Sequence, residues 1–138
     1  MITLPMNVIS DASVSGGQYI CTPNGFGDTS LPPTEGIATY SLTVEGGMYQ
    51  VQFRVISSVD GSFRIRIPTA TTNIANRQSS WILNDFNSSD TWIWDYVENR
   101  DDGETVVFTM SQESYTLEVA YRDDGALLDM IVVMDKLD

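Results

Sequence analysis

The feature that most constrains the fold is a regular alternation of apolar and polar side chains in short runs along the chain. The run 48–57 places Tyr49, Val51, Phe53 and Val55 on one side and polar side chains on the other. A period of two is that of a β-strand with one buried face. Runs of the same kind cover residues 37–44, 62–68, 105–110, 114–121 and 126–134. β-Branched and aromatic residues fill these runs, as is typical of strands.

Turn-forming residues separate the runs at short intervals. The pair Asp60-Gly61 predicts a hairpin between the two runs that flank it. The last run, 126–134, could also be helical, but its Ile-Val-Val core and the turn at 123–125 favour a strand. We therefore predict an all-β chain of about eight to ten strands, folded as a jelly-roll β-sandwich of two antiparallel sheets. With 138 residues and no linker, it is predicted to be a single domain over residues 1–138.

The charge balance excludes several classes of partner. Acidic residues outnumber basic ones 19 to 7, for a net charge of −12. This balance argues against nucleic acid and against an anionic membrane surface, since both require basic side chains. Histidine is absent and Cys21 is the one cysteine, so Ser-His and Cys-His catalytic pairs, internal disulfides and cysteine-based zinc sites are excluded. No apolar run reaches the roughly 18 residues of a membrane span, and residues 1–8 do not read as a signal peptide.

The acidic residues give little support for catalysis. They lie mainly in turn-like stretches such as 99–104 and 123–125, where solvated turns explain them. No phosphate-binding loop or nucleophile elbow is present, and we predict that the chain is not an enzyme and has no catalytic residues. The segment 85–90 opens like a calcium loop. However, it has Asp90 where that loop needs glycine and Tyr96 where it needs glutamate, so the segment does not match a calcium loop.

Asp129 is more informative, because it lies within the apolar run 126–134. A carboxylate among apolar neighbours needs a partner, which could be an arginine, backbone amides at a strand end, or calcium. Asp129 is therefore a candidate ligand of a structural calcium ion, and an internal salt bridge or backbone hydrogen bonds explain it equally well.

Three of the seven basic residues, Arg54, Arg64 and Arg66, lie on the polar faces of two consecutive predicted strands. If those strands are neighbours, three guanidinium groups share one sheet face. Such a face would suit the carboxylates or sulfates of an acidic glycan, because the planar fork of arginine binds both. Pairing with local acidic residues is the alternative.

The tryptophans surround a polar segment, 84–90, that we predict to be a loop. An exposed indole can stack on the apolar face of a sugar ring while nearby amides and carboxylates bind the hydroxyl groups, although core filling is the commoner role. Trp92 and Trp94 share a face if the segment is extended. We predict that Trp92 is partly accessible and that Trp94 anchors the sandwich.

Several segments in their order resemble a known family. They are 11–20, 36–55, 61–67, the Trp-x-Trp-Asp motif at 92–95, and 115–133. Together they resemble the jelly-roll carbohydrate-binding modules related to families six and thirty-five, of the type appended to secreted polysaccharide-degrading enzymes. The resemblance covers nearly the whole chain. It implies a secreted, non-catalytic module that holds a polysaccharide or oligosaccharide and targets an attached catalytic domain to its substrate. A structural or adhesion jelly roll without a sugar site is the alternative.

The resemblance also implies site residues. Loops at one end of the sandwich bind the glycan in such modules, and the aromatic candidates here are Phe26, Trp81 and Trp92. Arg122 and Asp124 match a loop that supplies polar sugar contacts. These families often hold a structural calcium between an N-terminal Glu-x-Glu pattern and a late aspartate, which Asp129 matches. The chain has no glutamate in its first eleven residues.

Overall fold

The described residues of the computed structural model, 2–27, 34–74, 81–100, 103–111 and 113–136, form eleven strands and one 3-10 turn, η1 (Ser15–Gly17). The strands are β1 (Asn7–Ser10), β2 (Gln18–Cys21), β3 (Ile37–Val44), β4 (Gly47–Ile56), β5 (Gly61–Arg66), β6 (Thr71–Thr72), β7 (Ile82–Phe86), β8 (Ile93–Tyr96), β9 (Phe108–Met110), β10 (Glu113–Tyr121) and β11 (Leu127–Asp135). Among these residues, no helix is long and apolar enough to cross a membrane.

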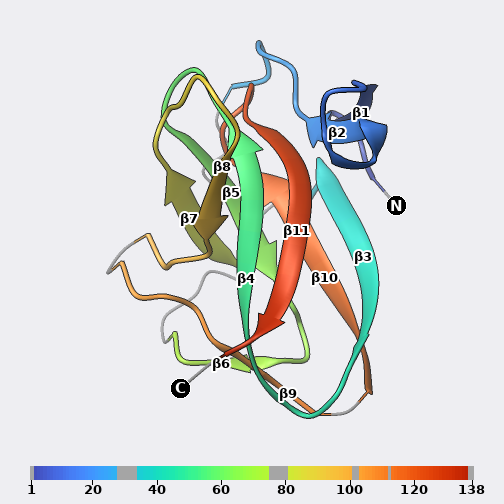
Figure 1. The fold of residues 1–138 in the computed structure, drawn as a ribbon, viewed down its shortest axis with the longest axis vertical. Coiled ribbons are helices and arrows are strands. Elements are labelled where there is room, and N and C mark those ends of the chain that lie inside the picture. Colours follow the sequence, from blue (N-terminus) through green and yellow to red (C-terminus); the bar gives the residue numbers. More distant parts are fainter. Residues whose placement is uncertain (1, 28–33, 75–80, 101–102, 112, 137–138) are drawn as a thin grey trace.

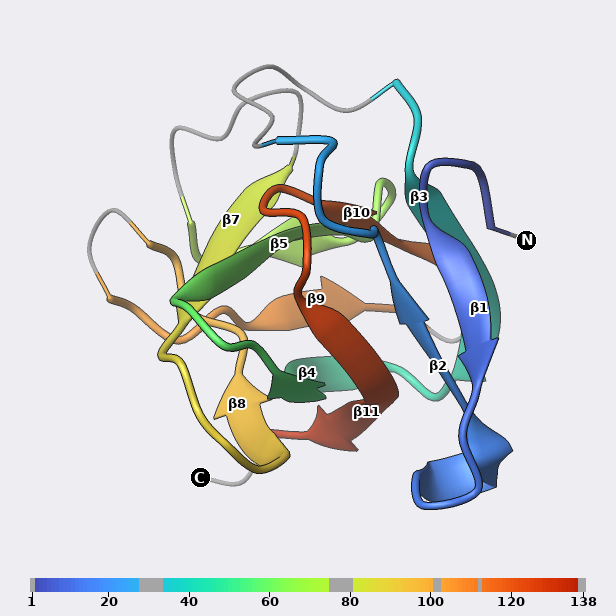
Figure 2. The same ribbon diagram turned by 90° about the horizontal axis from the view of Figure 1, so that it is seen from above.

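The strands form two antiparallel sheets packed face to face (Figures 1 and 2). The large sheet has seven strands in the order β1-β2-β11-β4-β9-β6, with β8 paired to β4 beside β9. The small sheet has four strands in the order β3-β10-β5-β7. In Figure 1, β4 and β11 lie in front of β5 and β10. The predicted all-β sandwich of two antiparallel sheets is confirmed.

The core lies between the sheets and is built by the alternation seen in the sequence. Val51, Phe53 and Val55 of β4 are at most 1% exposed and face the small sheet. Phe53 meets Phe63 of β5 edge to face, with ring centroids 6.2 Å apart. Burial of such side chains stabilises the fold by roughly 1.5–3 kcal/mol each relative to exposure. The polar positions between them, Gln50, Gln52 and Arg54, therefore lie on the outer face of the large sheet.

The predicted hairpin at Asp60-Gly61 is wrong. β4 belongs to the large sheet and β5 to the small one, so the connection 57–60 crosses between the layers. Gly61 has a different role there, because a Cβ atom on it would come within 2.7 Å of the Phe86 ring. That ring stacks on Phe63, so glycine allows β5 to lie close against β7.

The predicted strands are mostly confirmed. The run 37–44 coincides with β3, and the ambiguous last run is strand β11. Only 108–110 of the run 105–110 forms a strand, β9. The segment 84–90 was predicted as a loop, but its first three residues belong to β7, where Asn84 pairs with Phe63. In β7 the side chains alternate between more and less buried positions. The polar composition of residues 84–90 concealed this alternation in the sequence.

Candidate functional site

The outer face of the large sheet carries exposed aromatic side chains on β8. The pairing register places Trp94 opposite Arg54 and Tyr96 opposite Gln52, so all four side chains lie on the outer face. Trp94 is 49% exposed and Tyr96 is 42% exposed. The intervening Asp95 faces the other side of the strand. The edge strand β8 therefore presents two aromatic rings to solvent on one side.

A second aromatic pair lies beside them. The rings of Trp92 and Tyr19 have centroids 5.9 Å apart, and the Arg54 guanidinium lies 5.3 Å from the Trp92 ring centroid. Arg54 also forms an ion pair with Asp129 of β11, whose side chain is fully buried. A β-bulge between Leu128 and Met130 accommodates Asp129 at this point in the sheet. Side chains from β2, β4, β11 and the approach to β8 are thus joined in one cluster on the outer face.

The structure corrects two of the three predictions about tryptophan. Trp92 is half-buried, which confirms that it is partly accessible. Trp94 does not anchor the sandwich, because the register of β8 turns it to solvent. Trp81 is only 4% exposed, and the Arg66 guanidinium lies 4.3 Å from its ring centroid. An indole covered in this way cannot be the exposed platform that the resemblance implied.

The three arginines do not share a face, contrary to the prediction. Arg54 lies in the large sheet, whereas Arg64 and Arg66 lie in the small sheet, because β4 and β5 are not paired. Arg66 forms an ion pair with Glu118, with 2.9 Å between Nε and the carboxylate oxygen. Arg64 is 4% exposed, and burial first, then the neighbouring Arg122, lowers the pKa of its guanidinium. The alternative, pairing with local acidic residues, holds for Arg54 and Arg66.

Asp129 has the arginine partner that we gave as the alternative to calcium. Its carboxylate is paired with the Arg54 guanidinium, which supplies the positive charge that a buried carboxylate needs. Among the described residues, no three carboxylates, cysteines or histidines come together in a way that could hold a metal ion. The residues described here do not fit a calcium site at Asp129.

Phe26 and Asp124 lie together at one end of the sandwich. Phe26 is 58% exposed and lines a shallow hollow of about 270 Å³ with Leu4, Pro5 and Glu35. The Asp124 carboxylate accepts hydrogen bonds from the backbone N–H groups of Gly25 and Gly27, at 2.8 and 2.7 Å. Asp124 therefore fixes the loop that carries Phe26. Sugar contacts by either residue stay a prediction.

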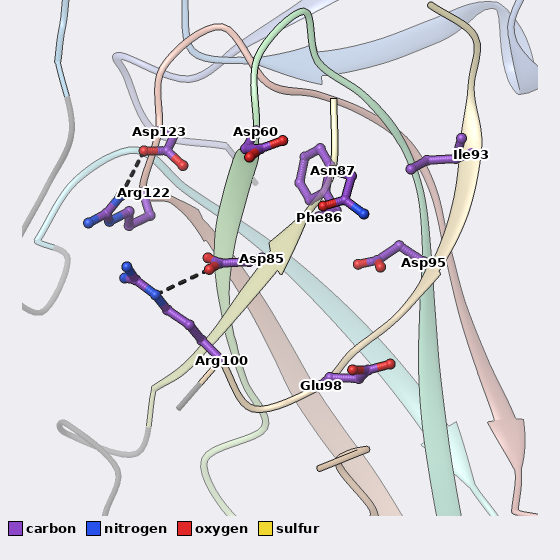
Figure 3. A pocket seen from close by; sticks show the side chains of 11 residues that line it. Asp60, Asp85, Phe86, Asn87, Ile93, Asp95, Glu98, Arg100, Arg122 and Asp123 are labelled. Carbon is purple, nitrogen blue, oxygen red and sulfur yellow. Dashed lines mark hydrogen bonds and ion pairs between the residues drawn. The ribbon is translucent and has the colours of Figure 1, made fainter. Parts of the chain in front are cut away.

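A larger hollow of about 660 Å³ opens between β7 and β8, where the edges of the two sheets meet. Its side chains come from both sheets and from the loops beside them (Figure 3). Asp60, Asp85, Asp95, Glu98 and Asp123 supply carboxylates, and Arg100 and Arg122 supply guanidinium groups. Figure 3 shows the Asp85–Arg100 and Arg122–Asp123 pairs on one side and Asp95 and Glu98 on the other. Arg122, a predicted sugar contact, thus lies in this hollow and is paired.

Asp95 links the two sheets at the edge of this hollow. Its carboxylate accepts a 2.7 Å hydrogen bond from the side-chain amide of Asn84, which is fully buried and also accepts a bond from the Glu98 N–H. Burial raises the pKa of Asp95 to about 6, against the lowering effect of the Asn84 bond, with Glu98 and Asp85 raising it further. This carboxyl group acts as a structural tie between β7 and β8.

Trp94 and Tyr96 are not among the residues predicted from the sequence as sugar contacts. The signal that could have found them is the alternation in 93–96, where Ile93 and Asp95 lie on one side and the two aromatic rings on the other. Both sides contain a large apolar residue, so the sequence does not say which side is buried. The pairing of β8 with β4 decides this.

Comparison with solved structures shows the class of fold. The chain is similar to the GH26-CBM35 β-(1,4)-mannanase of Podospora anserina, with a TM-score of 0.67 and 11% identity, over 99% of this chain and 26% of that protein. It is also similar to a CBM35 from Paenibacillus barcinonensis, with a TM-score of 0.63 and 14% identity, over 97% of this chain and 91% of that one. An exo-β-1,3-galactanase of Phanerochaete chrysosporium gives a TM-score of 0.64 at 15% identity, over 97% of this chain and 27% of that protein.

The CBM35 of Paenibacillus barcinonensis shares the fold of a carbohydrate-binding module with this chain. The predicted resemblance is thereby confirmed for the fold of family thirty-five, while for family six it stays a prediction. The chain spans about a quarter of the mannanase and of the galactanase. No family model matches the chain, and no curated protein matches it.

Proposed function

We propose that this chain is a non-catalytic module that binds a polysaccharide. The observation that carries the proposal is that Trp94, 49% exposed, stands beside Tyr96 on a fold shared with carbohydrate-binding modules. A large indole in water costs free energy, and a sugar ring stacked on it removes that apolar surface from solvent. Such a surface site buries less of its ligand than a deep pocket does. We therefore expect dissociation constants between about 1 µM and 1 mM.

The predicted preference for an acidic glycan loses its basis in the structure. It required three arginines on one face, and these are divided between the two sheets. The net charge of −12 also repels a polyanion at low ionic strength. We do not carry this preference into the proposal.

In its full protein, we propose that the module works outside the cell and brings an attached catalytic domain to its polysaccharide. The support is that the fold occupies about a quarter of the two larger carbohydrate-active neighbours. Calcium is left out of this proposal, because Asp129 is already paired with Arg54.

Affinity gel electrophoresis tests the function. The protein is run in gels that contain galactomannan, β-1,3-galactan, hydroxyethyl cellulose or polygalacturonate, and its mobility is compared with that of a non-binding protein of similar charge. We expect at least one polymer to retard it. Retardation by none, with folded protein, favours the alternative of a structural jelly roll. Release of reducing ends from any of these polymers would instead show that the chain is an enzyme.

A further inference from the structure

We infer that the ligand binds on the outer face of the large sheet, across β8 and β4, and that it is an internal stretch of a neutral polysaccharide. This inference rests on the proposed function and adds to it a site, a ligand class and a binding mode. The loop end, where Phe26 lies, is the competing location. The large sheet offers two aromatic rings on one strand, whereas Phe26 stands on a loop.

The spacing of the rings is set by the strand. Side chains at i and i+2 of a strand lie on one face about 6.5–7 Å apart, so Trp94 and Tyr96 form a row. Both rings are more than two-fifths exposed, at 49% and 42%. A row of two rings suits a ligand that extends over more than one sugar unit. A chain end is not needed to fill it, and internal stretches of a polymer can lie across it.

Hydrogen-bonding groups stand directly beside the two rings. Gln52 pairs with Tyr96 and Arg54 with Trp94 across the β4–β8 ladder. Directly opposite residues of an antiparallel pair have Cβ atoms about 4.5–5.5 Å apart. The Gln52 amide can donate to and accept from sugar hydroxyls, and the exposed quarter of the Arg54 side chain can donate.

Arg54 is held in place before any ligand arrives. Its guanidinium forms an ion pair with the buried Asp129 and lies 5.3 Å from the centroid of the Trp92 ring. A side chain already ordered in the free protein loses little conformational entropy on binding. The same ion pair sets the charge of the face.

The charge of this face points to a neutral ligand. On β4, β8 and β11, all of which the structure describes, the side chains turned outward are glutamine, methionine, valine, isoleucine, leucine and aromatic residues, apart from Arg54 and Asp129. Those two form an ion pair, so the face carries no net charge for a polyanion or a polycation to neutralise. Carboxylates are concentrated instead in the hollow on the other side of β8.

Variants on the two surfaces test the site. The double variant Trp94→Ala/Tyr96→Ala is compared with Tyr40→Ala, a matched control that removes an exposed aromatic ring from β3 of the small sheet. Phe26→Ala tests the loop end. The probe is whichever neutral gel, galactomannan, β-1,3-galactan or hydroxyethyl cellulose, retards the parent protein most. We expect the double variant to lose at least tenfold in affinity, and Tyr40→Ala and Phe26→Ala to stay within twofold. Thermal unfolding of each variant verifies the fold.

The outcomes separate this inference from the function. If no gel retards the parent protein, the proposed function fails. If the parent is retarded and the double variant is retarded equally, or if Phe26→Ala alone loses binding, the function stands and the site assignment is overturned. Stronger retardation by polygalacturonate than by every neutral gel overturns the ligand class. Oligosaccharides of the best neutral polymer, with their reducing ends reduced or intact, test the mode. Equal affinity together with affinity that rises with the number of sugar units supports internal binding, and a tenfold loss on reduction overturns it.

Discussion

The outer faces of the two sheets each carry an arginine, a tryptophan and a carboxylate in contact, and the tryptophan is buried on one face only. On the large sheet Arg54 lies over Trp92 and pairs with Asp129; on the small sheet Arg66 lies over Trp81 and pairs with Glu118. In the small sheet the indole is buried, at 4% exposed. In the large sheet Trp92 is half-buried, and the next aromatic on the strand, Trp94, is exposed.

An arginine–tryptophan–carboxylate group can therefore be part of the packed scaffold or lie beside an exposed surface. On the small sheet the group is closed, and its indole is part of the packed structure. On the large sheet the buried member is the carboxylate, with Asp129 at 0% and Arg54 at 25% side-chain exposure. The aromatic rings there are left for solvent or for a ligand.

The largest expected difference between the faces is in the two indoles. Trp81→Ala removes a buried ring and is expected to lower the free energy of unfolding by about 3–5 kcal/mol, because a cavity remains. Trp94→Ala removes a surface ring and is expected to change it by less than about 1 kcal/mol. Urea denaturation followed by circular dichroism measures both. Similar losses for the two variants would mean that the faces do not differ as described.

The two ion pairs give the next effect. Arg54→Ala takes the ion partner from a carboxylate sealed from water, and about 3 kcal/mol of stability should be lost. Arg66→Ala breaks an ion pair whose side chains are 28% and 16% exposed, so we expect the free energy of unfolding to decrease by about 1 kcal/mol. The same urea titration applies, with Arg100→Ala, from a pair that is 43% and 48% exposed, as the surface control. A larger loss for Arg66→Ala than for Arg54→Ala would reverse the ranking.

A smaller effect is expected from Asp95, on the hollow side of β8. Its pKa in the folded protein, about 6, is raised from the ordinary value of 3.8, so the folded state binds the proton more tightly than the unfolded state. The stability that this proton contributes is complete below about pH 4 and is lost as the pH rises through about 6. The melting temperature of the parent protein should therefore decrease as the pH rises from 5 to 7.5. The melting temperature of the Asp95→Asn variant should decrease less over the same range. If the melting temperatures of the parent protein and of Asp95→Asn change equally with pH, Asp95 is not the source of the pH dependence.

Calcium should have the smallest effect of all. Because the Arg54 guanidinium already pairs with Asp129, adding 5 mM Ca²⁺ or EDTA, roughly the range that saturates weak sites, is expected to leave the melting temperature unchanged. A calcium-dependent rise that is absent in Asp129→Asn would restore the metal site predicted from the sequence.

The site was harder to predict from the sequence than the strands were. The strand Ile37–Val44 could be read directly, because alternation is a local property. The pairing of β4 with β8 joins residues about forty positions apart, and no local pattern encodes it. For this reason the prediction that Trp94 lies inside is wrong. The prediction that Trp81 is exposed is wrong because Arg66, from the separate strand β5, covers its ring. The prediction of three arginines on one face is also wrong because it depended on the pairing of distant strands, and β4 and β5 lie in different sheets.

The amino-acid pattern is enough to predict that this chain forms strands, that they make a two-layered sandwich, and that Asp129 needs a partner. Which strands share a sheet, which indole faces water, and that the partner is Arg54 are known only from the folded chain. Strand formation follows from the period of neighbouring side chains. Exposure and ion pairing depend on which distant strand lies alongside.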